Sequence, residues 1–243
     1  MLIVDTGDLF FEQENIKESL HGSAQLKAEL IVQLYNQIGC DALNIGEIDF
    51  AMGLDFLKHL EKKANFPFLS ANLTDTKNQP LFRRYVIKNI NGIRVGIFGL
   101  LSDRAEISSK VKRVTNGSVI VQDALASAEN IMKELSGKAD LIIALTHHGV
   151  GRDWVIARRI KGIHLIIGGH DRQKLAEPHN ADGTLILQAG EKGQYVGHIR
   201  TSLSQDGSKA YKNELISLGK SFAGDAKIAA MVKEYQRKVA KLY

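Results

Sequence analysis

Residues 141–149 read LIIALTHHG, an unbroken apolar run that ends in two histidines and a glycine. A run without alternating polar residues indicates a strand that is buried on both faces, as in a parallel sheet covered by helices. Residues 164–170, HLIIGGH, contain a second run of this kind, and this one ends in two glycines and another histidine. Because α/β sheets bind ligands at the carboxyl ends of their strands, these histidines lie where a functional site is expected.

Two earlier apolar runs end in an acidic residue that follows a glycine. The run LIVDTGD ends in Asp8, and the run ALNIGE ends in Glu47. A single turn aspartate or strand-end histidine commonly has a structural role, but four such ends on four strands favour a shared site. We therefore expect Asp8, Glu47, His147 and His170 to converge on one point and to bind a divalent metal, either Zn²⁺, Mn²⁺ or iron.

The order of the patterns indicates a mixed α/β chain. Apolar runs alternate with helical patterns as far as residue 167, which is typical of parallel strands joined by helices. A hairpin interrupts this order at Asn91-Gly92, a strong two-residue turn signal. The C-terminal part becomes antiparallel, with a turn expected at Asp206-Gly207, and residues 227–241 form an amphipathic helix with a lysine-rich face.

Composition limits the classes of function. The 243 residues carry a net charge of +5, mostly from lysines spread along the chain, and no basic patch with interleaved aromatic residues indicates nucleic-acid binding. The single cysteine, Cys40, excludes an internal disulfide and a cysteine-cluster metal site. The apolar runs are far too short to span a membrane. The charge balance is compatible with a small anionic substrate, we expect no nucleic acid, and the oligomeric state stays open.

Five segments stand out, in chain order residues 4–10 (VDTGDLF), 66–73 (FPFLSANL), 145–149 (LTHHG), 168–170 (GGH) and 188–197 (QAGEKGQYVG). These segments resemble motifs of the 5′-nucleotidase family, which is part of the calcineurin-like metallophosphoesterase superfamily. The resemblance implies an α/β fold, namely a four-layer αββα sandwich with mixed parallel and antiparallel sheets. It also implies metal-dependent hydrolysis of phosphate esters, with residues 1–243 as a single domain that ends in a linker-like helix.

The chain departs from the family pattern in several places. The opening Asp-x-His motif and the C-terminal substrate domain have no counterpart in the sequence. The motif Gly-Asn-His-Glu corresponds to residues 46–49, so Glu47 stands for a metal-binding asparagine and Ile48 for the catalytic histidine. In the motif Gly-His-x-His, Arg172 stands for the second histidine. The resemblance therefore implies that one metal site is intact and the other is lost, with one ion per chain.

Three further residues are candidates for contact with substrate. The fixed charge and forked donors of Arg172 suit it to bind phosphate beside the lost metal site, where it would also stabilise developing charge. His148 is a candidate to replace the missing catalytic histidine, and packing beside His147 is the alternative. Asn72 is a candidate for the edge of the substrate site, although an Asx turn explains it equally well.

Two functions from different classes follow from these residues. The first is a phosphate-ester hydrolase similar to 5′-nucleotidases, acting on a small phosphate ester or a nucleotide-like substrate. The second is a catalytically degenerate module that binds a metal or a phosphate-bearing ligand on the same fold. The missing histidine favours the second function, since general acid catalysis is commonly worth ~10²–10⁴-fold in rate. The retention of ligand-capable side chains on four strands favours a functional metal, so hydrolysis is the leading interpretation. A sulfate-ester or thiosulfonate hydrolase stays open as a third interpretation. The resemblance implies a periplasmic or other extracytoplasmic location, although no signal peptide is visible.

Overall fold

Two β-sheets face each other in the computed structural model, which describes residues 1–203, 209–219 and 222–242. The smaller sheet has the order β1-β2-β3 and is parallel, and the larger has the order β10-β11-β9-β8-β6-β5. In the larger sheet β6, β8, β9 and β11 run parallel, and β5 and β10 are antiparallel edges. The strands are β1 (Val4–Asp5), β2 (Ala42–Asn44), β3 (Phe68–Leu69), β5 (Tyr85–Ile90), β6 (Ile93–Leu101), β8 (Leu141–His147), β9 (Leu165–Gly168), β10 (His179–Ala181) and β11 (Thr184–Leu187).

The apolar run of β8 is buried on both faces because successive side chains point to opposite sides of the sheet. Ile143 and Leu145 pack between the two sheets, in one core with Leu69 of β3. Ile142 and Ala144 point the other way and pack in a second core against helices. The unbroken run in the sequence therefore reflects two different cores, one on each side of β8.

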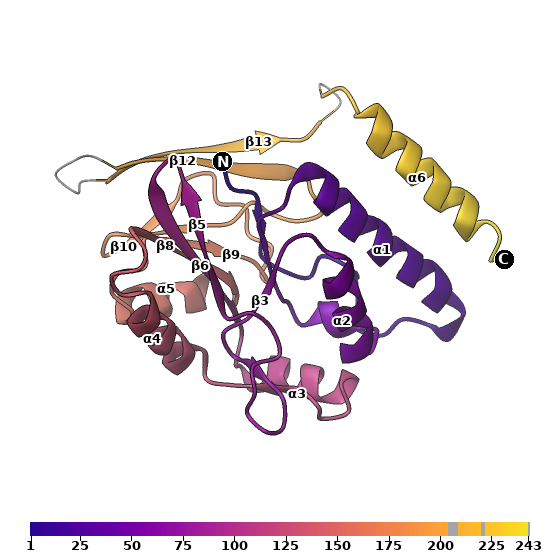
Figure 1. The fold of residues 1–243 in the computed structure, drawn as a ribbon, viewed down its shortest axis with the longest axis horizontal. Coiled ribbons are helices and arrows are strands. Elements are labelled where there is room, and N and C mark those ends of the chain that lie inside the picture. Colours follow the sequence, from indigo (N-terminus) through magenta and orange to yellow (C-terminus); the bar gives the residue numbers. More distant parts are fainter. Residues whose placement is uncertain (204–208, 220–221, 243) are drawn as a thin grey trace.

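Helices cover the outer face of each sheet (Figure 1). The small sheet packs against α1 (His21–Ile38), α2 (Gly53–Lys63) and α3 (Ala105–Val114) in a core that includes Phe68. The large sheet packs against α4 (Ala124–Leu135) and α5 (Val150–Arg159). The order of layers is helix, sheet, sheet, helix, so the expected four-layer αββα sandwich with mixed strand directions is confirmed.

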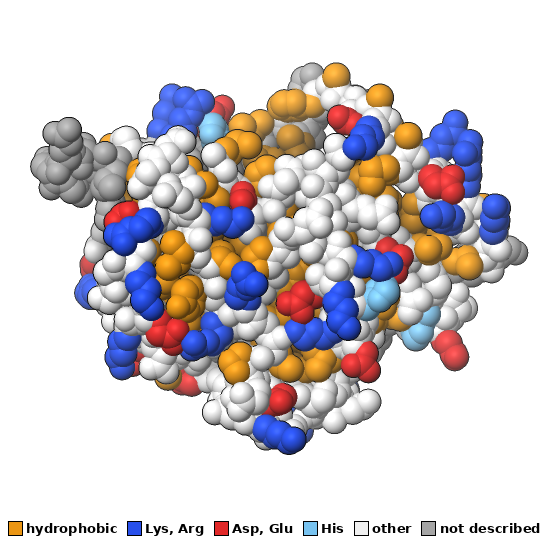
Figure 2. Space-filling model, in the orientation of Figure 1, with side chains coloured by type: hydrophobic (Ala, Val, Ile, Leu, Met, Phe, Trp, Pro, Cys, Tyr) orange, Lys and Arg blue, Asp and Glu red, His pale blue; other side chains and the backbone are white. Residues whose placement is uncertain are grey.

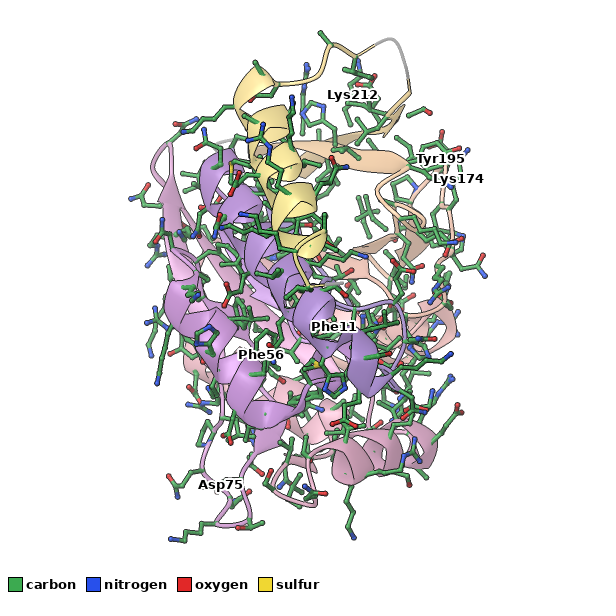
Figure 3. The ribbon with its side chains drawn as sticks, turned by 90° about the vertical axis from the view of Figure 1, so that its right-hand side faces the viewer. Phe11, Phe56, Asp75, Lys174, Tyr195 and Lys212 are labelled. Atoms are coloured by element: carbon green, nitrogen blue, oxygen red, sulfur yellow. The ribbon has the colours of Figure 1, made fainter. Side chains whose placement is uncertain are left out.

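The C-terminal part adds a hairpin and a final helix. The hairpin pairs β12 (Tyr195–Leu203) with β13 (Lys209–Ser217), and the turn expected at Asp206-Gly207 lies outside the described residues. Helix α6 (Ala226–Val239) lies across α1, as Figure 3 shows, and none of its residues is fully buried. No helix in the described part of the chain is both long and apolar enough to cross a membrane.

Some elements were not predicted from the sequence. Helix α3 and the short pair β4 (Leu73–Thr74) and β7 (Ile120–Val121) had no assigned pattern. The polar segment 171–183 contains the short strand β10. Lysine and arginine side chains lie scattered among acids on the face drawn in Figure 2 and do not gather in one patch there.

Candidate metal centre

Four strands end at the candidate site and carry its side chains. Asp8 follows β1, Glu47 follows β2, His147 is the last residue of β8, and His170 follows β9. The first two strands belong to the small sheet and the last two to the large sheet, so the site lies where the carboxyl ends of both sheets meet. This is the position at which α/β sheets commonly bind ligands.

The structure brings the four side chains together. Nε2 of His147 lies 3.0 Å from Oδ2 of Asp8 and 3.3 Å from Oε2 of Glu47. Nδ1 of His170 lies 3.1 Å from Oε1 of the same glutamate. Glu47, His147 and His170 each offer a ligand atom within 4.8 Å of the others. The expected convergence is therefore present in the geometry, and the role of these side chains as ligands is taken up below as a proposal.

The hydrogen bonds of His147 leave one nitrogen facing the acids. Its Nδ1 lies 2.8 Å from the carbonyl oxygen of Thr6, which can only accept, so Nδ1 carries the proton of the neutral ring. Its Nε2 then points at the carboxylate oxygens of Asp8 and Glu47. A nitrogen lone pair and two carboxylate oxygens repel one another unless a cation lies among them, either a proton or a metal ion.

The charges in the site shift two pKa values in opposite directions. Burial opposes a charge on His147, but the carboxylates of Asp8 and Glu47 outweigh it and raise the pKa of the imidazole to about 9. Burial also opposes a charge on Glu47, but a hydrogen bond from His170 and the nearby histidine charges outweigh it and lower the pKa of the carboxyl. These surroundings favour negative charge on the acids and positive charge between them, which is the arrangement that a bound divalent cation provides.

The donor set fits one divalent ion. Oε2 of Glu47 is buried and makes no hydrogen bond, which is costly for a carboxylate unless a cation satisfies it. Oδ1 of Asp8 accepts from the backbone N–H of Ile48 at 2.8 Å, so Oδ2 is left for the site. Two carboxylates and two imidazoles suit Zn²⁺, Mn²⁺ or Fe²⁺, and the acids balance the charge of the ion. Among the residues that the structure describes, Glu47, His147 and His170 are the one group of acids and histidines whose ligand atoms all lie within 4.8 Å of one another, and Oδ2 of Asp8 lies beside them, 3.0 Å from Nε2 of His147.

The backbone around the site adopts conformations that are unfavourable for residues other than glycine. Asp8 has a φ of 56° and His170 a φ of 82°, both in the left-handed region. Such conformations cost about 1–3 kcal/mol each and persist where the surrounding structure enforces them. Gly46 is required for a different reason, because a Cβ atom there would overlap the carboxylate of Asp8. These conformations are locally unfavourable, and they bring the carboxylates of Asp8 and Glu47 close together.

Asp49 contributes to this arrangement and was missed from the sequence. Its side chain is buried and accepts hydrogen bonds from four backbone N–H groups on two loops. Burial and the nearby charge of Asp8 raise the pKa of Asp49 to about 7, although the N–H groups oppose that rise. One signal in the sequence could have identified Asp49. It stands at the position of the glutamate in the Gly-Asn-His-Glu motif and is the only acid other than Glu47 in residues 46–49.

The structure does not support the expected substrate contacts of Asn72 and His148. Asn72 is fully buried, and its amide donates to the carbonyls of Leu101 at 2.8 Å and Gln122 at 3.0 Å and accepts from the Leu101 N–H. His148 is also fully buried, and burial lowers the pKa of its imidazole to about 3, so the ring is neutral and closed to substrate. The burial of both side chains favours the structural alternatives, which are packing beside His147 for His148 and a local hydrogen-bonding role for Asn72.

Arg172 lies two residues after His170 on the same loop, but its guanidinium does not join the four side chains. The Arg172 side chain is 57% exposed, and its guanidinium nitrogen donates to Oε2 of Glu191 at 3.2 Å. An exposed ion pair of this kind is worth only about 0–1 kcal/mol, so it holds the side chain weakly.

Comparisons with known proteins give a consistent set of relatives, although no family model matches the chain. The chain is 31% identical over 246 residues to the trifunctional nucleotide phosphoesterase protein YfkN of Bacillus subtilis. The alignment covers 84% of this chain and 16% of that protein. It is 30% identical over 194 residues to the 5′-nucleotidase of Vibrio parahaemolyticus, and this alignment covers 67% of this chain and 34% of that protein. The chain therefore spans far less than two thirds of either relative.

The similarity extends to solved structures. The crystal structure of the calcineurin-like phosphoesterase YfkN from Bacillus subtilis superposes with a TM-score of 0.81 at 25% identity. The superposition covers 98% of this chain and 83% of that one, so both sheets and their helices have counterparts there.

Proposed function

Because this chain belongs to the calcineurin-like metallophosphoesterase superfamily, with 5′-nucleotidases among its relatives, we propose that it hydrolyses phosphate esters with one divalent metal ion. Asp8, Glu47, His147 and His170 hold the ion. The observation that carries the proposal is the buried Oε2 of Glu47, which accepts no hydrogen bond and lies 3.3 Å from the inward-facing Nε2 of His147. A small phosphate ester or a nucleotide-like molecule is the proposed substrate.

The chain's own residues orient the ligands. When bound, a divalent ion supplies Lewis acidity toward a phosphoryl oxygen and makes water a stronger nucleophile at neutral pH. The carbonyl of Thr6 fixes the tautomer of His147, and the N–H of Ile48 fixes the carboxylate of Asp8. The side chain of Ile48 has no proton to give to a leaving group, so esters with good leaving groups are favoured.

A catalytically inactive binding module is the second candidate function. It is favoured by one observation, which is the aliphatic side chain of Ile48 next to the candidate ligand Glu47. Turnover of an activated ester by metal-loaded protein distinguishes the two functions. Hydrolysis of p-nitrophenyl phosphate above the rate of metal alone supports the enzyme, and tight metal binding without any turnover supports the binding module.

Metal content is the first prediction from the proposed site. Protein reconstituted with excess Mn²⁺ or Zn²⁺ and then desalted should retain about one ion per chain, because Glu47, His147 and His170 form the one ligand group found among the described residues. Elemental analysis measures this ratio. Binding should weaken as the pH falls below about 9, the raised pKa of the His147 imidazole without metal, because a ligand nitrogen must lose its proton before it binds the ion. Two tightly held ions, or none, would contradict the one-ion site.

Arg172 is proposed to bind the phosphate group of the substrate. Because its pair with Glu191 is exposed and weak, the guanidinium is free to turn toward an anion. Arg172→Ala should raise KM for a phosphate ester about tenfold, since a charged hydrogen bond contributes roughly 1.5–3 kcal/mol and this one is partly exposed. The value of kcat should change little if the contact is uniform in ground and transition states. Glu191→Gln is the matched control and should lower KM slightly, and equal KM for all three proteins would exclude the contact.

The wider setting of the chain is also a proposal. The relatives are several times longer than their matched parts, so the substrate selectivity of those whole proteins is not carried over to residues 1–243. We propose that these residues form one domain and that α6, which packs on α1 without a fully buried residue, is its linker-like end. Limited proteolysis that cut within the two sheets before α6 would contradict this. Cell fractionation tests the proposed extracytoplasmic location.

A further inference from the structure

We infer that Asp49 is a positioning residue that sets the spacing of two metal ligands, Asp8 and Glu47, without touching the metal. The inference rests on the proposed function. Asp49 belongs to a one-turn 3₁₀ helix, Ile48–Phe50, directly after Glu47, and only 1% of its surface is exposed. A carboxylate buried to this degree needs several hydrogen bonds to remain in place.

The carboxylate of Asp49 gathers N–H groups from both ligand loops. Its Oδ2 accepts from the N–H of Asp8 at 2.9 Å and from the N–H of Gly46 at 2.9 Å. Its Oδ1 accepts from the N–H of Leu9 at 2.9 Å and from the N–H of Phe10 at 3.2 Å. Successive N–H groups that converge in this way form a concave site for an anion, and here the anion is a side chain of the same protein.

The two loops hold each other reciprocally. Asp49, on the loop after β2, accepts from the backbone of Asp8, and Asp8, on the loop after β1, accepts from the backbone of Ile48 at 2.8 Å. The strands β1 and β2 pair over only two residues each, so the ladder alone constrains the loops weakly. The left-handed conformation of Asp8 must also be stabilised by its surroundings. The bonds to Asp49 provide this restraint, because they hold Gly46 and Asp8 to the same oxygen atom.

Asp49→Asn tests the inference, because an amide replaces one acceptor oxygen by a donor that faces two N–H groups. Affinity for Zn²⁺ or Mn²⁺, measured by isothermal titration calorimetry on folded protein, should fall about 10–100-fold, the range typical of residues that orient metal ligands. Asp75→Asn is the matched control for the loss of a loop-capping carboxylate. Asp75 accepts from the N–H groups of Lys77 and Gln79 in a loop that holds none of the four ligands (Figure 3). Its variant should bind metal as tightly as the wild type.

A second control separates positioning from general stability. Ile131→Ala removes a buried side chain of α4 in the core between α4, α5 and the large sheet. It should lower the melting temperature at least as much as Asp49→Asn and leave metal affinity unchanged. Rescue is expected for hydrolysis measured at saturating metal, where Asp49→Asn should recover most of its kcat while its dissociation constant for the metal stays high.

The outcomes distinguish this inference from the proposed function. Wild-type protein that binds no divalent metal would overturn both. Wild-type protein that binds metal, with an Asp49→Asn variant of equal affinity, would overturn the inference alone. If the variant does not fold, amide hydrogen exchange in the wild type decides the question. The N–H groups of Asp8, Leu9, Phe10 and Gly46 should then exchange as slowly as those of β8, and fast exchange at these four positions would refute the inference.

Discussion

Replacing His170 with alanine should lower metal affinity by more than about 100-fold, because a residue that merely orients a ligand already accounts for 10–100-fold. Hydrolysis of every phosphate ester should be lost with the metal. The change removes a proposed ligand and also the partner of Oε1 of Glu47, whose side chain is only 4% exposed. A buried acid without its partner is strongly disfavoured, so Glu47 should bind a proton more readily and compete less well for the metal.

The measurement is metal titration followed by assay with p-nitrophenyl phosphate. His198→Ala is the matched control, because His198 also lies near a carboxylate, with Nδ1 3.9 Å from Oε2 of Glu214, but in the hairpin β12–β13. This variant should keep wild-type affinity and turnover. A His170→Ala protein that retains full metal content and activity would remove His170 from the proposed ligands and leave its pair with Glu47 as a purely structural contact.

Replacing Ile48 with histidine should raise the rate of hydrolysis of a nucleoside monophosphate by up to ~10²–10⁴-fold, the usual contribution of general acid catalysis. The same change should alter hydrolysis of p-nitrophenyl phosphate only a few-fold, because p-nitrophenolate leaves without a proton. Residue 48 is suitably placed, since its backbone N–H donates to Oδ1 of Asp8 at 2.8 Å and it follows Glu47 directly. The Ile48 side chain is only partly buried and packs at the edge of the core formed with α1 and α2, so a polar ring of similar size is tolerable there.

Ile48→Gln is the control for the change in polarity and shape at this position. Glutamine has hydrogen-bonding groups but does not exchange protons near neutral pH, so it should give no comparable gain with the nucleotide. The ratio of the two esters' kcat/KM values, measured for wild type and both variants, separates proton donation from other effects. An equal gain with both esters, or an equal gain from glutamine, would contradict the proposed role of this position.

The patterns in the sequence were sufficient to predict a mixed α/β chain and the strand ends that carry the site, and the four layers were implied by its resemblance to a known family. The apolar run of residues 141–145 indicated a strand buried on both faces, and the structure places its side chains in two cores. Asp8, Glu47, His147 and His170 could be chosen because each follows such a run, and the carboxyl ends of parallel strands meet at one edge. Local pattern and strand direction are properties that the order of residues encodes directly.

The tertiary structure alone decided where the remaining side chains point. His147 and His148 are neighbours, but side chains alternate at the end of a strand, so one faces the site and the other is enclosed in the interior. The hydrogen bonds of Asp49 reach backbone groups about forty residues earlier in the chain, as with its bond to Asp8. Such bonds depend on the left-handed turn at Asp8 and on the packing of two loops, and no periodic pattern extends beyond the strand to indicate them. Residue order therefore determined which strands meet, and the packing of their loops determined which polar groups face the site.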